Sequence, residues 1–63
     1  MTVIREYLRE NGIKQTFVCK KTGISEAKMS AILRERQKMT VEEYVEICRA
    51  LDVPLQFFFD PAA

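Results

Sequence analysis

Residues 15–34 read QTFVCKKTGISEAKMSAILR, and the organisation of the whole chain can be worked out from this segment. Apolar residues recur at helical spacing on both sides of Gly23, which predicts one helix over about residues 15–22 and another over about 26–34. Glycine permits a sharp turn because it has no Cβ that could clash. Ser25 is suited to cap the second helix, since its hydroxyl can accept a hydrogen bond from a free backbone N–H of the first turn. The segment therefore predicts two short helices joined by a tight turn.

The second of these helices is apolar on one side. Met29 and Ile32 are three residues apart, so they share a face and are expected to pack on the core. Cys19 is a small side chain on the first helix, which lets the second helix approach where the two cross at about 90–120°. The opposite side of the second helix is then free, and the major groove of DNA is wide enough for one helix.

Helical periodicity continues on both sides of this segment, and no strand pattern interrupts it. It predicts three further helices: about residues 2–11, ended by Asn11-Gly12; about 41–51, opened by a capping box of Thr40 and Glu43; and about 54–59, opened by Pro54, with Leu55 and Phe58 turned inward. A chain of 63 residues is expected to form a single domain, residues 1–63. The predicted fold is all-α, a compact bundle of five short helices around one core.

The net charge of the chain is only +1, but the charges are unevenly distributed. Residues 14–38 hold seven Lys and Arg against two Glu, which gives +5, and residues 39–63 hold one Arg against five Asp and Glu, which gives −4. Such asymmetry is expected when one surface faces phosphates and another does not. A solvated helix face produces similar charge runs, so this pattern alone indicates DNA binding weakly.

Composition disfavours several other classes of protein. No apolar run approaches the roughly 18 residues that span a bilayer, and residues 1–6 carry charges where a signal peptide is apolar, so we expect a cytoplasmic protein without a membrane partner. Cys19 and Cys48 occupy apolar helix positions and are expected to be reduced core residues. The sequence has no histidine, no Cys-x-x-Cys pair and no glycine-rich phosphate loop. We therefore expect no metal, no cofactor, no small-molecule ligand and no enzymatic activity.

Three stretches carry a similarity to a known family: IREYLRENGIKQ at residues 4–15, TGISEAKMSAIL at 22–33 and TVEEYVEICRALDVP at 40–54. In their order and spacing they resemble the Cro/CI-type helix-turn-helix domain of phage and bacterial regulators, also called lambda-repressor-like or XRE-like. The resemblance covers residues 4–59, nearly the whole chain. It implies a lambda-repressor-like DNA-binding domain whose helix-turn-helix unit lies at about residues 15–34. The implied function is sequence-specific binding of double-stranded DNA and transcription regulation, most simply as a repressor.

The resemblance also implies roles for individual residues. Those expected to bind DNA are Gln15, as a phosphate contact that can brace the next helix; Ser25, Glu26, Ala27, Lys28 and Ala31, as groove-facing positions of the recognition helix; and Arg34, Arg36 and Lys38, as backbone contacts after it. Among these, Lys28 is the strongest candidate for a contact to a base. Lys20 and Lys21 are interpreted as plain surface charge.

Two departures from the family pattern affect these assignments. The family often has Gln or Arg where Glu26 and Ala27 stand. Because Glu26 would repel a phosphate, it must either face a base edge such as a cytosine amino group or form an intramolecular pair. The usual Asn-Gly after the recognition helix is replaced by Arg34-Glu35, which alters the expected backbone contacts of that loop.

The aromatic run Phe57-Phe58-Phe59 predicts a surface for self-association. Successive side chains of a helix point about 100° apart, so three adjacent rings cannot all enter one core. Phe58 is expected in the core, which leaves Phe57 and Phe59 partly exposed. Exposed apolar patches usually mark a partner surface, and the family often forms dimers through C-terminal helices. We therefore expect a homodimer that buries Phe57 or Phe59 and binds a pseudo-palindromic operator.

Two alternative functions remain open. The chain could be the antitoxin of a toxin–antitoxin pair, which binds DNA but chiefly masks a toxin, here with its aromatic C-terminus. It could instead be a protein-interaction module that keeps the fold and has lost DNA binding, which the low net charge and Glu26 slightly favour.

Overall fold

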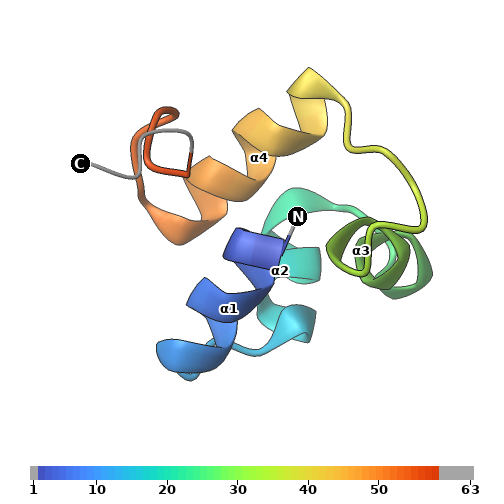
Figure 1. Ribbon diagram of the computed structural model, residues 1–63, viewed down its shortest axis with the longest axis horizontal. Coiled ribbons are helices and arrows are strands. Elements are labelled where there is room, and N and C mark those ends of the chain that lie inside the picture. The colour runs from blue at the N-terminus through green and yellow to red at the C-terminus, as the bar shows by residue number, and fades with distance from the viewer. Residues whose placement is uncertain (1, 59–63) are drawn as a thin grey trace.

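Four α-helices form the chain in the computed structural model, which describes residues 2–58. They are α1 (Thr2–Glu10), α2 (Gln15–Thr22), α3 (Glu26–Leu33) and α4 (Val41–Leu51), and the described residues contain no strand (Figure 1). The predicted bounds of α2 and α4 are confirmed, whereas α1 and α3 each end one residue earlier than predicted. Helix α2 packs against both α3 and α4, and α1 also contacts α3.

The core takes side chains from all four helices. Its buried members are Ile4, Leu8, Val18, Cys19, Met29, Ile32, Leu33, Tyr44, Ile47 and Cys48. Each fully buried aliphatic side chain contributes about 1.5–3 kcal/mol relative to exposure, so this shared core holds the short helices together. The two cysteines are free, as expected, and burial raises the pKa of the Cys19 thiol. A protonated thiol is a poor nucleophile, which fits a packing role.

The predicted fifth helix over about residues 54–59 is wrong for the described residues. Residues 55–58 form a turn, closed by a bond of 3.0 Å from the Phe57 N–H to the Pro54 carbonyl. Leu55 was predicted to face inward but is 50% exposed, while Phe58 packs against the core as predicted. The hydroxyl of Tyr44 donates to the Leu55 carbonyl. That carbonyl therefore has a tertiary partner, and a single turn is too short to offset the cost of helix nucleation.

The turn between α2 and α3 is held by local hydrogen bonds. Gly23, where the sequence predicted a sharp turn, has a left-handed φ of 80°. The Thr22 hydroxyl donates to the Val18 carbonyl at 2.8 Å and accepts from the Ile24 N–H at 3.2 Å. The turn thus has a second anchor beside glycine, which orients α3 relative to α2.

Side-chain caps open α3 and α4 where the sequence predicted them. The Ser25 hydroxyl accepts from the Lys28 N–H at 3.2 Å. The Thr40 hydroxyl accepts from the Glu43 N–H at 3.1 Å, and a Glu43 carboxylate oxygen accepts from the Thr40 N–H at 2.9 Å, which completes the predicted capping box. Both helix starts are therefore locally determined.

No helix among residues 2–58 has the length and apolar character that a bilayer crossing requires.

Candidate nucleic-acid interface

Helix α3 is attached to the core along one side. Met29, Ile32 and Leu33 are each at most 3% exposed, and their spacing of three and four residues places them on one face. The prediction that Met29 and Ile32 are core residues is confirmed. Figure 1 shows α3 at the edge of the molecule, where its outer side has no helix against it.

The residues predicted to face a groove lie away from that anchored side. Ser25, Glu26, Ala27 and Lys28 are exposed, and Ala31 is half-buried. Together these five residues form the predicted groove-facing surface, which covers the first turns of α3. The side chains in the middle of this surface are small, because Ala27 and Ala31 carry only methyl groups, which permit close approach of a ligand. Glu26 lies in the first turn, where the helix dipole favours an acid.

Gln15 links the start of α2 to the start of α3. Its side-chain Nε2 donates to the Glu26 carbonyl at 3.3 Å. This is the bracing role that the resemblance implied for Gln15. Since Gln15 is the first residue of α2, the backbone N–H groups of that helix start lie beside the groove-facing surface. Helix starts of this kind favour anions such as phosphate.

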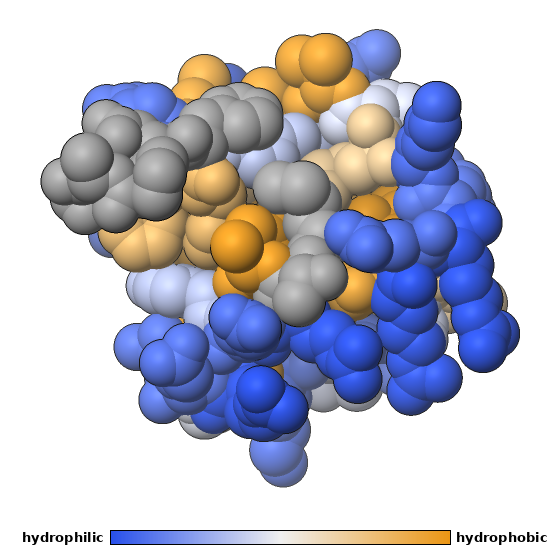
Figure 2. All heavy atoms as spheres, viewed as in Figure 1, coloured by the Kyte–Doolittle hydropathy of each residue, from blue (hydrophilic) through white to orange (hydrophobic). Residues whose placement is uncertain are grey.

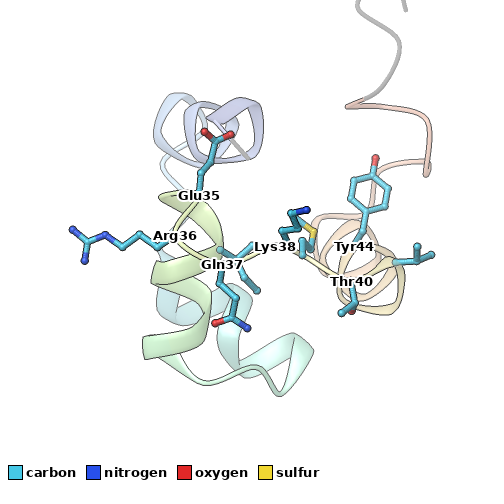
Figure 3. Close-up of a pocket in the computed structure, with 9 residues that line it drawn as sticks. Glu35, Arg36, Gln37, Lys38, Thr40 and Tyr44 are labelled. Carbon is cyan, nitrogen blue, oxygen red and sulfur yellow. The ribbon is translucent and has the colours of Figure 1, made fainter.

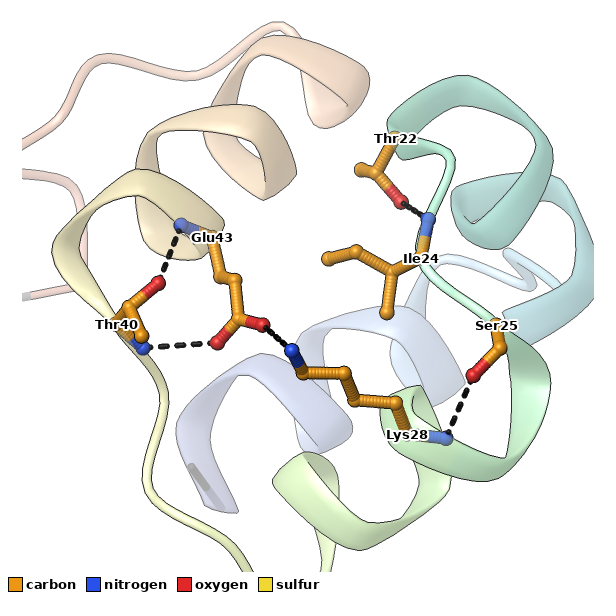
Figure 4. A network of polar contacts seen from close by, with 6 residues as sticks. All are labelled: Thr22, Ile24, Ser25, Lys28, Thr40 and Glu43. Carbon is orange, nitrogen blue, oxygen red and sulfur yellow. Dashed lines mark hydrogen bonds and ion pairs between the residues drawn. The ribbon is translucent and has the colours of Figure 1, made fainter.

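Lys28 has an intramolecular partner that the sequence did not reveal. Its Nζ lies 2.5 Å from a carboxylate oxygen of Glu43 at the start of α4 (Figure 4). The Lys28 side chain is 43% exposed and that of Glu43 is 11% exposed. The hydrogen bond from Lys28, followed by that from the Thr40 backbone, lowers the pKa of Glu43. Glu43 is therefore ionised at neutral pH.

The capping box contains one sequence signal that Glu43 could bind a further side chain. A capping-box carboxylate uses one oxygen for the backbone N–H of the cap residue, which leaves its second oxygen for another donor. Which donor reaches that oxygen depends on how α3 and α4 each pack against α2, and this packing is a tertiary property.

Two backbone hydrogen bonds from the following loop close the C-terminal end of α3. The Arg36 N–H donates to the Ala31 carbonyl at 2.8 Å and the Glu35 N–H donates to the Ile32 carbonyl at 3.1 Å. The two bonds form a Schellman motif. Glu35 occupies the position of this motif where glycine is most common. Glu35 accordingly has a positive φ of 61°. The chain therefore makes the turn that the family's Asn-Gly usually makes, with a residue that carries a Cβ.

The basic residues of this loop are all exposed: Arg34, Arg36 and Lys38. A hollow of about 710 Å³ lies between the loop and the start of α4, and its lining includes Arg36, Lys38, Ile32 and Tyr44. In Figure 3 the Arg36 side chain points away from α4. Figure 2 shows hydrophilic side chains along the right-hand edge of the molecule, where Figure 1 has α3 and this loop. The loop thus presents positive charge beside the groove-facing surface.

The residues predicted for a dimer contact are only partly covered by the described chain. The Phe57 ring is 40% exposed and makes edge-to-face contacts with Tyr7 and Phe58, at centroid distances of 5.4 and 5.0 Å. Phe59 lies outside the described residues. Leu55 and Val3 are 50% and 47% exposed, and Val3 lies one helical turn from Tyr7 on α1. The described part of this region is therefore an aromatic and aliphatic surface.

Comparison with known proteins places this geometry in one family. Residues 3–56, most of the chain, match the family described as the Cro/C1-type HTH DNA-binding domain. This confirms the resemblance predicted from the sequence. No curated protein and no solved structure matches the chain.

Proposed function

We propose that this chain, which belongs to the Cro/C1-type helix-turn-helix DNA-binding domain family, is a sequence-specific transcriptional repressor. The observation that carries the proposal is the one-sided anchoring of α3, with Met29 and Ile32 buried and the opposite side exposed. A recognition helix in this kind of domain enters the major groove with its N-terminal residues on the base edges.

Base reading is assigned to the start of α3. The methyl groups of Ala27 and Ala31 suit apolar contact with thymine methyl groups, and the Glu26 carboxylate suits a cytosine amino group. Lys28 is the side chain of this surface that can donate to guanine. Gln15, at the start of α2, contacts a phosphate and so sets the depth of α3 in the groove.

General affinity is assigned to the loop after α3. Arg34, Arg36 and Lys38 are exposed and follow the recognition helix directly, where they can reach the phosphate backbone. Each phosphate contact that a basic residue makes releases counterions, which makes affinity depend on salt with a slope of about 0.9 per contact.

Self-association is assigned to the aromatic surface of Phe57, Tyr7 and Leu55. Phe57 is 40% exposed and Leu55 is 50% exposed, and exposed apolar side chains favour burial against a second copy. A two-fold dimer would place two α3 helices about 34 Å apart on a pseudo-palindromic operator. Occupation of that operator would exclude RNA polymerase, which is the proposed mechanism of repression.

The test is selection of binding sites from a random duplex library, followed by fluorescence anisotropy of the selected duplex over a range of salt. We expect a two-fold symmetric motif and an affinity that falls steeply with salt. Arg36→Gln should lower the salt slope by about 0.9, whereas Lys20→Gln, an equal charge change on the exposed part of α2, should leave it unchanged. Absence of any enriched sequence, together with no binding at low salt, would contradict the proposal.

A second candidate is a protein-interaction module that has lost DNA binding. The Lys28–Glu43 pair favours it, because Lys28 is the one cation among the groove-facing residues and Glu43 offsets its charge. This candidate predicts that the chain does not bind a DNA duplex. Arg36→Gln and Lys28→Ala then have no DNA affinity to change. The same anisotropy measurement separates the two, since the module has no salt-dependent affinity for a duplex.

A further inference from the structure

The ion pair between Lys28 and Glu43 joins the recognition helix to α4. Lys28 is the third residue of α3, and Glu43 is the third residue of α4. The Lys28 ammonium therefore reaches across from the groove-facing surface to the next helix (Figure 4). Its partner has 11% of its side chain exposed, so the pair is screened by solvent on the lysine side more than on the glutamate side.

Glu43 is held in place independently of Lys28. One of its carboxylate oxygens accepts from the Thr40 N–H at 2.9 Å, and the other lies 2.5 Å from Lys28 Nζ. The backbone N–H of Glu43 donates to the Thr40 hydroxyl at 3.1 Å. A carboxylate fixed by a helix cap is pre-organised to receive an ammonium, because little side-chain freedom is lost when the pair forms.

We propose that Glu43 is a specificity-determining residue that competes with DNA for Lys28. The inference rests on the proposed function and assigns a regulator of affinity to the same site. While Lys28 is paired, it brings no net positive charge to the phosphate backbone, so attraction to DNA of any sequence is weakened. A site that offers Lys28 a better acceptor than Glu43 regains that interaction. Specificity is a difference of affinities, and weakening the wrong complexes raises it.

The charges around Lys28 support this assignment. Glu26 lies two residues earlier in the same exposed turn, and Glu43 lies across from it on α4. Glu26, Lys28 and Glu43 together have a net charge of −1, so the start of α3 has no excess positive charge. Within α3 and the loop that follows it, the excess positive charge lies in the loop, where Arg34, Arg36 and Lys38 outnumber Glu35 and where the proposed contacts are to phosphates and not to bases.

The experiment compares Glu43→Gln with Glu42→Gln. Glutamine can replace glutamate in a capping box, so Glu43→Gln keeps the start of α4 while it releases Lys28. Glu42→Gln is the matched control, since it removes the same charge from an exposed neighbour in the same first turn. Affinity is measured by anisotropy for the selected operator and for a scrambled duplex, each over a range of salt. Circular dichroism establishes that each variant is folded.

We expect Glu43→Gln to bind the scrambled duplex severalfold more tightly than Glu42→Gln does, with a salt slope larger by about 0.9. The ratio of operator to scrambled affinity should fall in Glu43→Gln alone. The double variant Lys28→Gln/Glu43→Gln removes both charges of the pair, and it should lose the gain in scrambled-duplex affinity and in salt slope that Glu43→Gln shows. The double variant has the same net charge as the wild type and contains no lysine that the loss of Glu43 could release.

Two results would overturn the inference while the proposed function stands. In the first, the wild type binds DNA but Glu43→Gln and Glu42→Gln have the same affinities and slopes. In the second, the double variant loses as much scrambled-duplex affinity as Arg36→Gln, which would mean that Lys28 contacts phosphate in the wild type. Failure of the wild type to bind any duplex would overturn the proposed function, and this inference with it.

Discussion

The side-chain amide of Gln15 donates to the main-chain carbonyl of Glu26, 3.3 Å away, and so joins the first turn of α2 to the first turn of α3. The two residues are 11 positions apart, on opposite sides of the turn at Gly23. The bond fixes the distance between the proposed phosphate contact and the groove-facing surface. Gln15 therefore has a structural function within the unit in addition to its proposed contact.

Replacing Gln15 by alanine should loosen α3 relative to α2. We expect a loss of about 0.5–1.5 kcal/mol in the free energy of unfolding, the net value of one hydrogen bond, and a larger loss of operator affinity because a phosphate contact is lost as well. Urea denaturation and anisotropy measure the two effects. Thr16→Ala, at the next exposed position of α2, is the control. Equal behaviour of the two variants would show that the bond is not formed in solution.

Glu35 predicts an unusual order of stability among substitutions. At ordinary positions alanine is more stable than glycine, but a left-handed residue with a Cβ is strained by about 1–2 kcal/mol. Glu35 has a φ of 61°. Glu35→Gly should therefore be more stable than Glu35→Ala by about 1 kcal/mol, and both variants lack the same side-chain contacts. Thermal denaturation gives the comparison, and a more stable alanine variant would contradict the left-handed assignment.

Glu43 predicts a loss of stability in acid. Its pKa is lowered in the folded state, chiefly by the hydrogen bond from Lys28 and then by that from the Thr40 backbone. The folded state therefore binds this proton less readily than the unfolded state. The stabilisation is present above about pH 4.3, the ordinary pKa of glutamate, and is lost as the pH falls through the lower folded pKa. Urea midpoints across the acid range should fall less for Glu43→Gln than for Glu42→Gln, and parallel curves would contradict this.

Met29 is the side chain through which α3 is most completely buried, at 0% exposed. Met29→Ala should cost about 2–5 kcal/mol, which is comparable to the whole stability of a domain this small, at about 0.05–0.15 kcal/mol per residue. We expect a largely unfolded variant at room temperature by circular dichroism. Met39→Ala, at a half-buried position of the following loop, should remain folded. A folded, cooperative Met29→Ala variant would mean that α3 has other sufficient anchors.

Phe57 predicts the oligomeric state. Phe57→Glu should give a monomer in sedimentation velocity at concentrations where the wild type is a dimer, because a carboxylate cannot be buried in an apolar contact. Phe17→Glu is the matched control, since Phe17 is a phenylalanine of similar exposure, 45%, on α2. A wild type that sediments as a monomer at tens of micromolar, or equal effects of the two substitutions, would exclude this surface as the dimer contact.

Features that depend on near neighbours in the chain could be predicted from the sequence alone. The bounds of α2 and α4, the left-handed Gly23, the Ser25 cap and the Thr40–Glu43 capping box all follow from residues within a turn or two of each other. The buried face of α3 also follows, since its apolar residues repeat with the period of the helix. The family followed from these local patterns, because their order and spacing form its signature.

Other features depended on residues that are distant in the sequence. The segment after α4 reads as a helix, but Tyr44 donates to the Leu55 carbonyl, and residues 55–58 form a turn. Lys28 reads as a free cation of the recognition helix, but α4 brings Glu43 within 2.5 Å of it. Glycine is usual where Glu35 stands, and the left-handed conformation there closes the end of α3 all the same. Local hydrogen bonds and periodicity are encoded within a few residues, whereas the partner of an outward side chain or a free carbonyl is decided by which helices pack together.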